Sequence, residues 1–325
     1  MVTTRQVFRG AARTMRAIDR EAKRSQARRV AYERSAQKIA LLEEAADAAD
    51  EYQQMIDQLV GAHRIAFRPV DWEAKAQCEP LPMPERTSVT EEAARRAAGG
   101  YHPNWFDRTF GLARGKVARL ESAVAHAVIH DEAMHRAECG KVRAVNDGIE
   151  LARKLIALDR DAVAKVVNEQ SGLGDLPFCV EALDLWFGEN RQVIARVDGL
   201  DLEDMPTQSV TLLQSGKASV KPLSPAKIQE LHRANICASA LRVAVELLKV
   251  VPVPMVEVVM ETDLLDPATG HIEPKPVLSV KVSRQAIATL ALERTEAPAV
   301  VERLGGEMDW NSRRGFAAIA DGCVA

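Results

Sequence analysis

The amino-terminal fifth of the chain, residues 3–64, contains no proline and therefore permits one very long helix. Its glycines are Gly10 and Gly61, and alanine, arginine, glutamate, glutamine and lysine, which favour helix, dominate its composition. Apolar residues recur there at helical spacing and include Ile18, Ala22, Ile39, Leu42, Ala46, Ala49, Tyr52, Ile56 and Leu59. A continuous helix of this length would measure roughly 90 Å. Such a helix requires a partner that covers its apolar stripe.

A second helical arm is predicted after a proline-rich connector, residues 68–103. Within the connector, residues 69–78 are expected to form one short helix that Asp71 caps. Asn104, with Asp107 three residues later, resembles an N-cap pair. Beyond it, a heptad-like seam comprises Val117, Leu120, Val124, Ala127, Asp131, Met134, Val142, Val145, Ile149, Ala152 and Ile156. The pattern ends near residues 168–177.

The two arms are about equally long and flank the connector. The simplest arrangement that buries both stripes is a long antiparallel helical hairpin, a coiled coil over residues 1–170. A parallel dimer of one or both arms is the alternative, and the sequence leaves the choice between pairing within one chain and pairing between chains open.

Residues 176–325 have the pattern of a compact α+β domain with a mostly antiparallel sheet. Ser215-Gly216 separates two short strand-like runs and indicates a hairpin. Ser224-Pro225 predicts the start of a helix of wide apolar arc, which Pro252 ends. Further strands are expected near residues 256–260 and 277–282, followed by a short helix that Ser283 caps and a last helix near residues 297–304.

Cysteine usage and charge limit the classes of partner. The five cysteines are far apart and form no CxxC pair, which favours a reducing cytoplasm over a disulfide framework. No apolar run reaches the roughly 18 residues that span a bilayer. Residues 1–40 hold 11 Lys/Arg against 3 Asp/Glu, a net charge of +8, whereas residues 171–325 hold 15 against 21, a net of −6. The chain therefore offers a basic amino end and an acidic carboxyl domain.

Three stretches together resemble a group of bacterial proteins with an amino-terminal coiled coil and a carboxyl-terminal α+β domain. They are "NWFDRTFG", "SGKASVKPLSPAKIQELHRANICASALRVAVELLKVVPV" and "TDLLDPATGHIEPKPVLSV". The resemblance covers most of residues 100–285. It implies the architecture and a bacterial cytosolic origin, and it supplies no catalytic residues.

The segment from Asp263 to Lys281 has the outline of a metal-dependent nuclease core, in which two acids hold a divalent cation and a lysine assists. Asp263 and Asp266 supply acids and Lys281 the lysine, but Ser279 stands where the second acid belongs. Alternation predicts that Lys281 lies on the wetter face of a strand. No catalytic residue is therefore assigned, and these three residues remain a weak alternative.

Two histidines on the second arm suggest a metal site. His126 and His130 are four residues apart, a spacing at which helical side chains chelate metals. His135 and Cys139 share that spacing but lie on the opposite side of the helix, so the four cannot form one tetrahedral site. No metal or cofactor is predicted, and His126 with His130 is kept as a weak alternative.

The amino-terminal segment is a basic amphipathic helix with separated faces. Its apolar face is half alanine. Its basic face comprises Arg5, Arg9, Arg13, Arg16, Arg20, Lys23 and Arg24. This face suits an anionic lipid surface, the phosphates of nucleic acid, or an acidic protein surface such as the carboxyl domain of another copy.

The connector and its borders concentrate aromatic residues, which are Phe67, Trp72, Tyr101, Trp105, Phe106 and Phe110. They are expected to build a small local core that closes the hairpin. If exposed, they would form a patch for a partner or a membrane.

The sequence thus predicts a non-enzymatic, cytoplasmic scaffold or interaction protein. Its contacts would use the coiled coil, with homo-oligomerisation, and the basic amino-terminal helix. The alternative is a nucleic-acid-binding protein, with or without a divergent nuclease-like domain. A third option is peripheral attachment to an anionic membrane.

Overall fold

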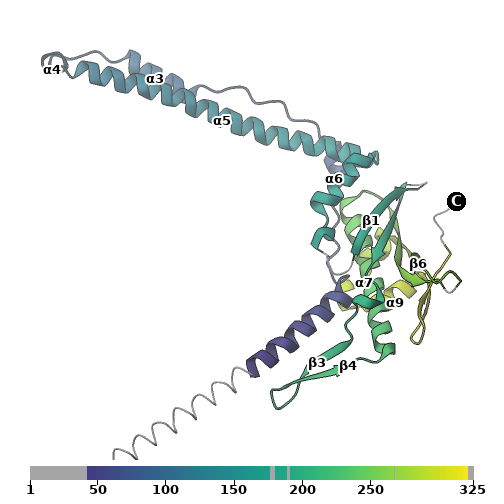
Figure 1. The fold of residues 1–325 in the computed structure, drawn as a ribbon. Helices are drawn as coiled ribbons and strands as arrows, with labels where there is room; N and C mark the ends of the chain where they lie inside the picture. The colour runs from purple at the N-terminus through teal and green to yellow at the C-terminus, as the bar shows by residue number, and fades with distance from the viewer. Residues whose placement is uncertain (1–41, 176–179, 189–190, 267, 321–325) are drawn as a thin grey trace, which may run out of the picture. The chain divides into compact units, whose positions relative to one another are not determined.

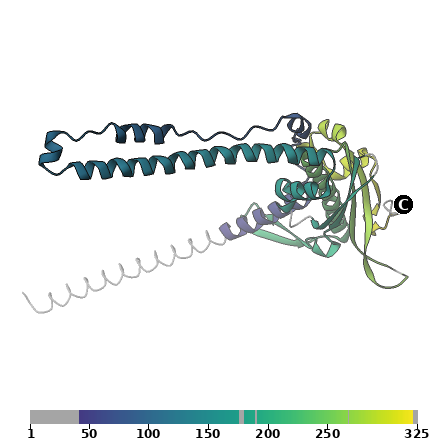
Figure 2. The same cartoon turned by 90° about the horizontal axis from the view of Figure 1, so that it is seen from above.

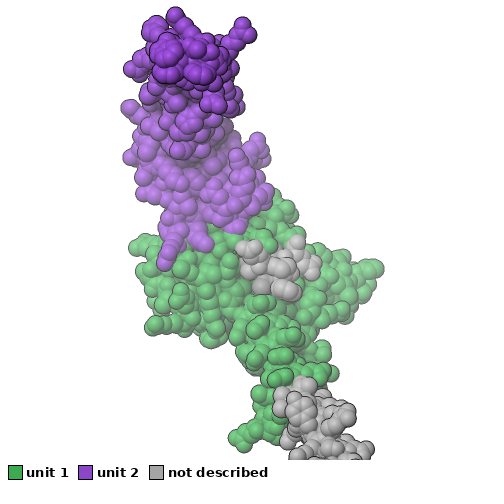
Figure 3. All heavy atoms as spheres, turned by 90° about the vertical axis from the view of Figure 1, so that its left-hand side faces the viewer, with its two compact units in different colours: residues 1–67, 172–246, 254–325 green, residues 68–171, 247–253 purple. Residues whose placement is uncertain are grey.

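The computed structural model describes residues 42–175, 180–188, 191–266 and 268–320. They combine helices with a sheet, in agreement with the predicted α+β class. The chain forms two compact units (Figure 3). Unit 1 comprises residues 1–67, 172–246 and 254–325, and unit 2 comprises residues 68–171 and 247–253. The expected division at residues 170–176 differs from this one, since residues 42–67 group with the sheet.

Unit 1 contains a six-stranded sheet in the order β1-β2-β5-β6-β7-β8. Its strands are β1 (Val180–Phe187), β2 (Gln192–Gly199), β5 (Met255–Leu265), β6 (Ile272–Ser283), β7 (Glu307–Asn311) and β8 (Gly315–Ala317). Strands β2 and β5 pair in parallel, and the other neighbours pair antiparallel. The sheet is therefore mixed, and the expectation of a mostly antiparallel sheet is not confirmed.

Helix α7 (Pro225–Val250) supplies the core of unit 1. It starts at the predicted Ser-Pro step, where the Ser224 hydroxyl accepts the amide of Lys227 at 3.3 Å. Its wide apolar arc is buried, as the sequence predicts, and it packs tightly on β2: a Cβ at Gly199 would lie 2.7 Å from Ile236 Cδ1. Gly199 is therefore required for this close approach.

Short elements complete unit 1. Ser283 caps α8 (Arg284–Ala288), as predicted, and α9 (Ala297–Arg303) coincides with the expected last helix. Strands β3 (Gln208–Leu212) and β4 (Ala218–Pro222) form the predicted hairpin, with Gly216 in its turn at φ +76°. The terminal strands β7 and β8 carry no signal that the sequence analysis recognised.

The described part of the first predicted arm, residues 42–61, is helical and docks on α7 within unit 1. Leu59 packs in a cluster with Met205 and Leu231, and Ile56 and Val60 lie against it. At its end, Asn235 Nδ2 of α7 donates to the Leu59 carbonyl at 3.0 Å, and Arg242 Nη1 donates to the Ala62 carbonyl at 3.1 Å. Within the described residues, Leu59 of the predicted stripe is buried and the other stripe positions are half-buried, so the stripe is covered in part, and by elements of unit 1 that include α7. Residues 1–41 lie outside the described residues.

Unit 2 is built on α5 (Ala113–Ile156), which is accompanied by α2 (Trp72–Gln77) and α3 (Val89–Gly99). Helix α4 (Trp105–Thr109) precedes α5, and α6 (Arg160–Gln170) follows it. Figures 1 and 2 both show α3 beside α5, and α2 also contacts α5. The pairing of α5 with the first arm is not confirmed, because its neighbours in unit 2 come from the connector.

Side chains of α5 hold the connector in place. Asp131 Oδ2 accepts the amides of Thr90 at 3.1 Å and Glu91 at 2.9 Å, which caps α3 from outside its own chain segment. Asn146 exchanges two hydrogen bonds with the backbone of Leu81. Asp131, an acid in an otherwise apolar seam, is therefore explained as a cap. Helix α3 itself was not predicted.

Candidate functional site

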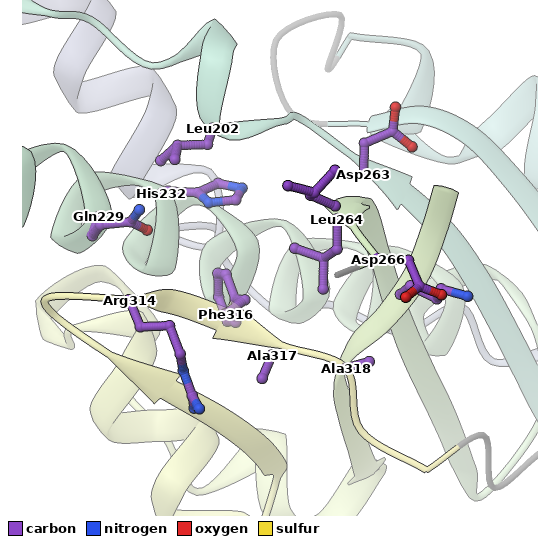
Figure 4. A pocket seen from close by; sticks show the side chains of 12 residues that line it. Leu202, Gln229, His232, Asp263, Leu264, Asp266, Arg314, Phe316, Ala317 and Ala318 are labelled. Atoms are coloured by element: carbon purple, nitrogen blue, oxygen red, sulfur yellow. The ribbon is translucent and has the colours of Figure 1, made fainter. Parts of the chain in front are cut away.

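Unit 1 contains a cavity of about 630 Å³. Its apolar lining comes from Leu202, Leu264, Leu265, Phe316, Ala317 and Ala318. Its polar lining comes from Gln229, His232, Asp263, Asp266, Lys275 and Arg314. Figure 4 shows labelled side chains around it from α7, from the end of β5, from β8 and the residues beside it, and Leu202 from the short turn at Leu202–Asp204. The sequence predicted a strand only near residues 256–260, whereas β5 continues to Leu265, so Asp263 lies on the strand and Asp266 follows it.

His232 is the polar group deepest in this cavity. It is 3% exposed, and its ring meets Phe316 edge-on with centroids 5.2 Å apart. Its Nε2 lies 2.9 Å from the Leu200 carbonyl, so Nε2 carries the proton and Nδ1 is an acceptor. Burial lowers the pKa of His232 and keeps the imidazole neutral at neutral pH. A neutral ring fixed by a main-chain carbonyl presents Nδ1 as a hydrogen-bond acceptor, and none of the described residues that line the cavity is a serine, threonine or cysteine that it could activate.

The charged groups at the rim largely neutralise their neighbours. Lys275 Nζ lies 2.7 Å from Glu273, a hydrogen bond that raises the pKa of Lys275. Arg314 Nη2 lies 2.7 Å from Asp309 Oδ1. The cavity therefore offers an apolar wall, the carboxylates of Asp263 and Asp266, and two cations that are already paired.

Acidic groups gather beside the end of β5. Asp201 Oδ1 accepts the hydroxyl of Thr262 at 2.6 Å and the amide of Asp263 at 2.8 Å. The pKa of Asp198 is raised, first by burial and then by Asp201 and Asp263. The Asp201 carboxylate is thus used within the fold, where it fixes the end of β5.

The structure does not bring the nuclease candidates together. Asp263 pairs with Pro274, whereas Lys281 pairs with Glu257, six positions earlier on β5. At about 3.3 Å per residue, the two sites are roughly 20 Å apart along the strand. Lys281 Nζ lies 3.5 Å from Glu257 Oε2, and its side chain is exposed, as alternation predicted. The structure therefore does not bring Asp263 and Lys281 together into one site.

Glu257 is the centre of a polar cluster that the sequence analysis missed. Its carboxylate is 8% exposed and accepts from Gln192 Nε2 at 2.6 Å and from the Ser279 hydroxyl at 3.2 Å. Ser279 occupies the position where a nuclease core would have its second acid. Here it donates a hydrogen bond to Glu257 on the neighbouring strand β5. The cluster satisfies a nearly buried acid and has a structural role.

The structure does not gather the histidines of α5 into one cluster. His126 and His130 are exposed, and His130 Nδ1 lies 3.5 Å from Asp131 Oδ1. His135 contacts Cys139 Sγ at 3.6 Å. Within the described residues, no group of three or more histidine, cysteine, aspartate or glutamate side chains is arranged to hold a metal ion.

The aromatic residues of the connector do not form the expected local core. Trp72 is 3% exposed and donates from Nε1 to the Val250 carbonyl at 2.7 Å, within unit 2. Trp105, Phe106 and Phe110 are instead exposed, with ring centroids 4.0 Å apart for the first pair and 6.4 Å for the second. These three residues, here called the aromatic tip, lie at the turn between α3 and α5 (Figure 1).

An ion pair between a buried aspartate and a half-exposed lysine holds the aromatic tip. Asp107, in the middle of α4, is 3% exposed and pairs with Lys116 Nζ at 2.7 Å and with the Tyr101 hydroxyl at 2.8 Å. The Lys116 hydrogen bond is the main cause that lowers the pKa of Asp107. Asn104 Oδ1 accepts the Asp107 amide at 2.9 Å, which confirms the predicted N-cap pair.

The basic amino-terminal face, Arg5 to Arg24, lies outside the described residues. Among the described helices, none combines the length and apolar content needed to cross a bilayer. No family model matches the chain, and neither a curated protein nor a solved structure matches it. The resemblance of residues 100–285 to bacterial coiled-coil proteins therefore remains an expectation.

Proposed function

We propose that this protein is a non-enzymatic interaction protein that self-associates through α5. The observation that carries the proposal is the small burial of this helix: α5 has 44 residues, and five of them are buried. Ile129, Met134 and Val145 are each about half exposed or more. A long helix with apolar side chains in water is stabilised by a second helix that covers them.

Two of the exposed apolar residues define one contact face. Met134 and Val145 are eleven residues apart, which is three turns with an offset of about 20°. Ile129 is about 140° away from Met134 around the helix. The face of Met134 and Val145 adjoins the buried seam of Ala127, Asp131 and Ile149. A second copy of α5 that packs there extends the apolar seam.

Helices α2 and α3 and the connector between them contact part of α5, but Met134 and Val145 remain about half exposed. The proposal thus keeps the coiled coil predicted from the sequence, but α5 pairs in it with α5 of a second copy of the chain. The long antiparallel hairpin of the two arms is not part of it, because residues 42–61 use their stripe on α7.

The basic amino-terminal segment is proposed as a second contact surface in the cytoplasm. Its net charge of +8 complements the −6 of residues 171–325, so the segment of one copy suits the acidic unit of another. Such a contact weakens as salt screens it. The dispersed cysteines support the cytoplasmic setting.

Light scattering coupled to size exclusion tests self-association of the full chain. We expect the mass of a dimer or larger oligomer, and a monomer for the variant Met134→Glu with Val145→Glu. Ile129→Glu is the matched control, because it places the same charge on another face of the same helix. A monomeric parent protein at every concentration, or equal loss in the control, would overturn the proposal.

A further inference from the structure

The aromatic tip of unit 2 is an exposed apolar surface in a basic setting. Trp105 is 64% exposed, Phe106 52% and Phe110 67%, and Leu112 beside them is 54% exposed. Exposed tryptophan and phenylalanine side chains in contact with one another are rare on proteins that bind nothing there. We propose that the aromatic tip inserts into the surface of an anionic membrane.

Hydrogen bonds around the aromatic tip hold its backbone in a conformation that leaves the three rings exposed. Asp107 belongs to the same short helix, α4, and is 3% exposed, and Lys116 and Tyr101 hold its carboxylate. The Thr109 hydroxyl donates to the Trp105 carbonyl at 2.7 Å, and Gly111 turns the chain into α5 at φ +66°. These contacts fix the local backbone, and the three rings are exposed before any ligand binds.

Charge complementarity selects an anionic surface. Arg108, Arg114 and Arg119 flank the rings and are exposed. No carboxylate of the described residues lies within ion-pair distance of these three guanidinium groups. Trp and Phe with adjacent arginines match the interface of an anionic bilayer, where rings lie at headgroup level and cations meet lipid phosphates.

The size of the tip argues against a protein partner. A buried aromatic side chain covers about 150–250 Å², so the exposed parts of three rings offer roughly 350 Å². A stable protein interface requires about 800 Å² from each partner. A few rings on a convex turn fall short of that area but suffice for shallow insertion among lipid headgroups.

Flotation of the full chain with lipid vesicles tests the inference. We expect binding to mixed vesicles of phosphatidylcholine and phosphatidylglycerol, and much weaker binding to phosphatidylcholine alone. The variant Trp105→Ala, Phe106→Ala, Phe110→Ala is expected to bind at least about tenfold less. Reversal of Arg108 and Arg114 to glutamate is expected to cost at least about fivefold for each charge. All these residues are exposed, so melting curves of the variants should match the parent.

Two controls make the test specific. Leu212→Ala with Val220→Ala removes equally exposed apolar side chains from the β3–β4 hairpin and should leave flotation unchanged. Reversal of Arg9, Arg13, Arg16 and Arg20 should leave the effect of the ring substitutions intact. Absence of flotation in the parent, or flotation that survives loss of the rings and ends with the amino-terminal reversal, would overturn the inference. The variant Met134→Glu with Val145→Glu leaves the aromatic tip unchanged and should still float with vesicles. Its mass and its flotation therefore test self-association and membrane binding separately.

Discussion

Asn235 of α7 offers a quantitative test of where the first helical arm docks. Its side chain is fully buried, and Nδ2 donates to the carbonyl of Leu59 at 3.0 Å. That carbonyl is at the end of the helix of residues 42–61, where no further turn of helix follows to provide a partner. The substitution Asn235→Ala therefore leaves a buried carbonyl without its donor.

The expected cost is about 2 kcal/mol, within the roughly 1–3 kcal/mol of an unsatisfied buried polar group. For a unit of this size, each kcal/mol shifts the melting temperature by about 2–4 °C, so we expect a decrease of about 4–8 °C. Because the bond holds the end of one helix, hydrogen exchange in residues 42–63 should increase more than in β5 and β6.

Ser239, one turn further along α7, is the matched control. It is equally buried, but its hydroxyl has no hydrogen-bond partner among the described residues. Ser239→Ala should therefore be neutral or stabilising by up to about 1 kcal/mol. Thermal unfolding with hydrogen exchange by mass spectrometry decides the matter. Equal losses in the two variants, or unchanged exchange at residues 42–63 in Asn235→Ala, would refute the docking on α7.

Two further predictions concern ionisation. The amides of Glu91 and Thr90 lower the pKa of Asp131, so its stabilisation of unit 2 is complete above the unfolded pKa of about 3.9 and is lost as the pH falls through the lower folded value. Asp131→Asn should therefore lower the melting temperature at pH 7 and converge with the parent in acid; a constant difference across pH would contradict this. Burial raises the pKa of Cys237 to about 12, whereas Cys78 is exposed. Iodoacetamide at pH 8, read by peptide mass spectrometry, should label Cys78 in the native protein and Cys237 only after unfolding, and early labelling of Cys237 would show that α7 is not packed as described.

Local signals in the sequence predicted many elements of the fold. Asp71, Ser224 and Ser283 were recognised as helix caps, and each accepts the expected backbone amide. The Ser215-Gly216 turn and the wide apolar arc of α7 were also correct. Residues within one or two turns of each other determine these features, so local patterns in the sequence are sufficient to predict them.

Partners across long distances were harder to predict. The stripe of residues 42–61 indicated that a partner exists, but a stripe that fits α5 fits α7 equally well. Asn235 and Arg242, which decide for α7, are 176 and 180 residues from the carbonyls they bind. The crossover that makes β2 and β5 parallel neighbours is likewise invisible to local periodicity.

The candidate sites show the same division. The alternation of β6 predicted the exposed face of Lys281 and argued against a nuclease, and the register with Glu257 explains why. The cavity around His232 depends on β5, α7 and β8 meeting in space, and no motif marks it. The sequence showed that aromatic residues concentrate near α4, but it did not predict that they are exposed. Asp107 is held by Tyr101 and Lys116, which precede and follow it at unequal spacing, so no periodic pattern marks this anchor.

Oxidative cross-linking tests the central claim, that α5 contacts α5 of another copy, most directly. Cysteines are placed one at a time at Met134, Val145 and Ile129 in chains that carry Cys78→Ser, Cys139→Ser, Cys179→Ser and Cys323→Ser, which leave only the buried Cys237 of the native cysteines. Chains with Met134→Cys and Val145→Cys, alone or mixed, should form disulfide-linked dimers under mild oxidation, and Ile129→Cys should remain monomeric. Equal linking at Ile129, or no linking at Met134 and Val145 in any mixture, would contradict the account.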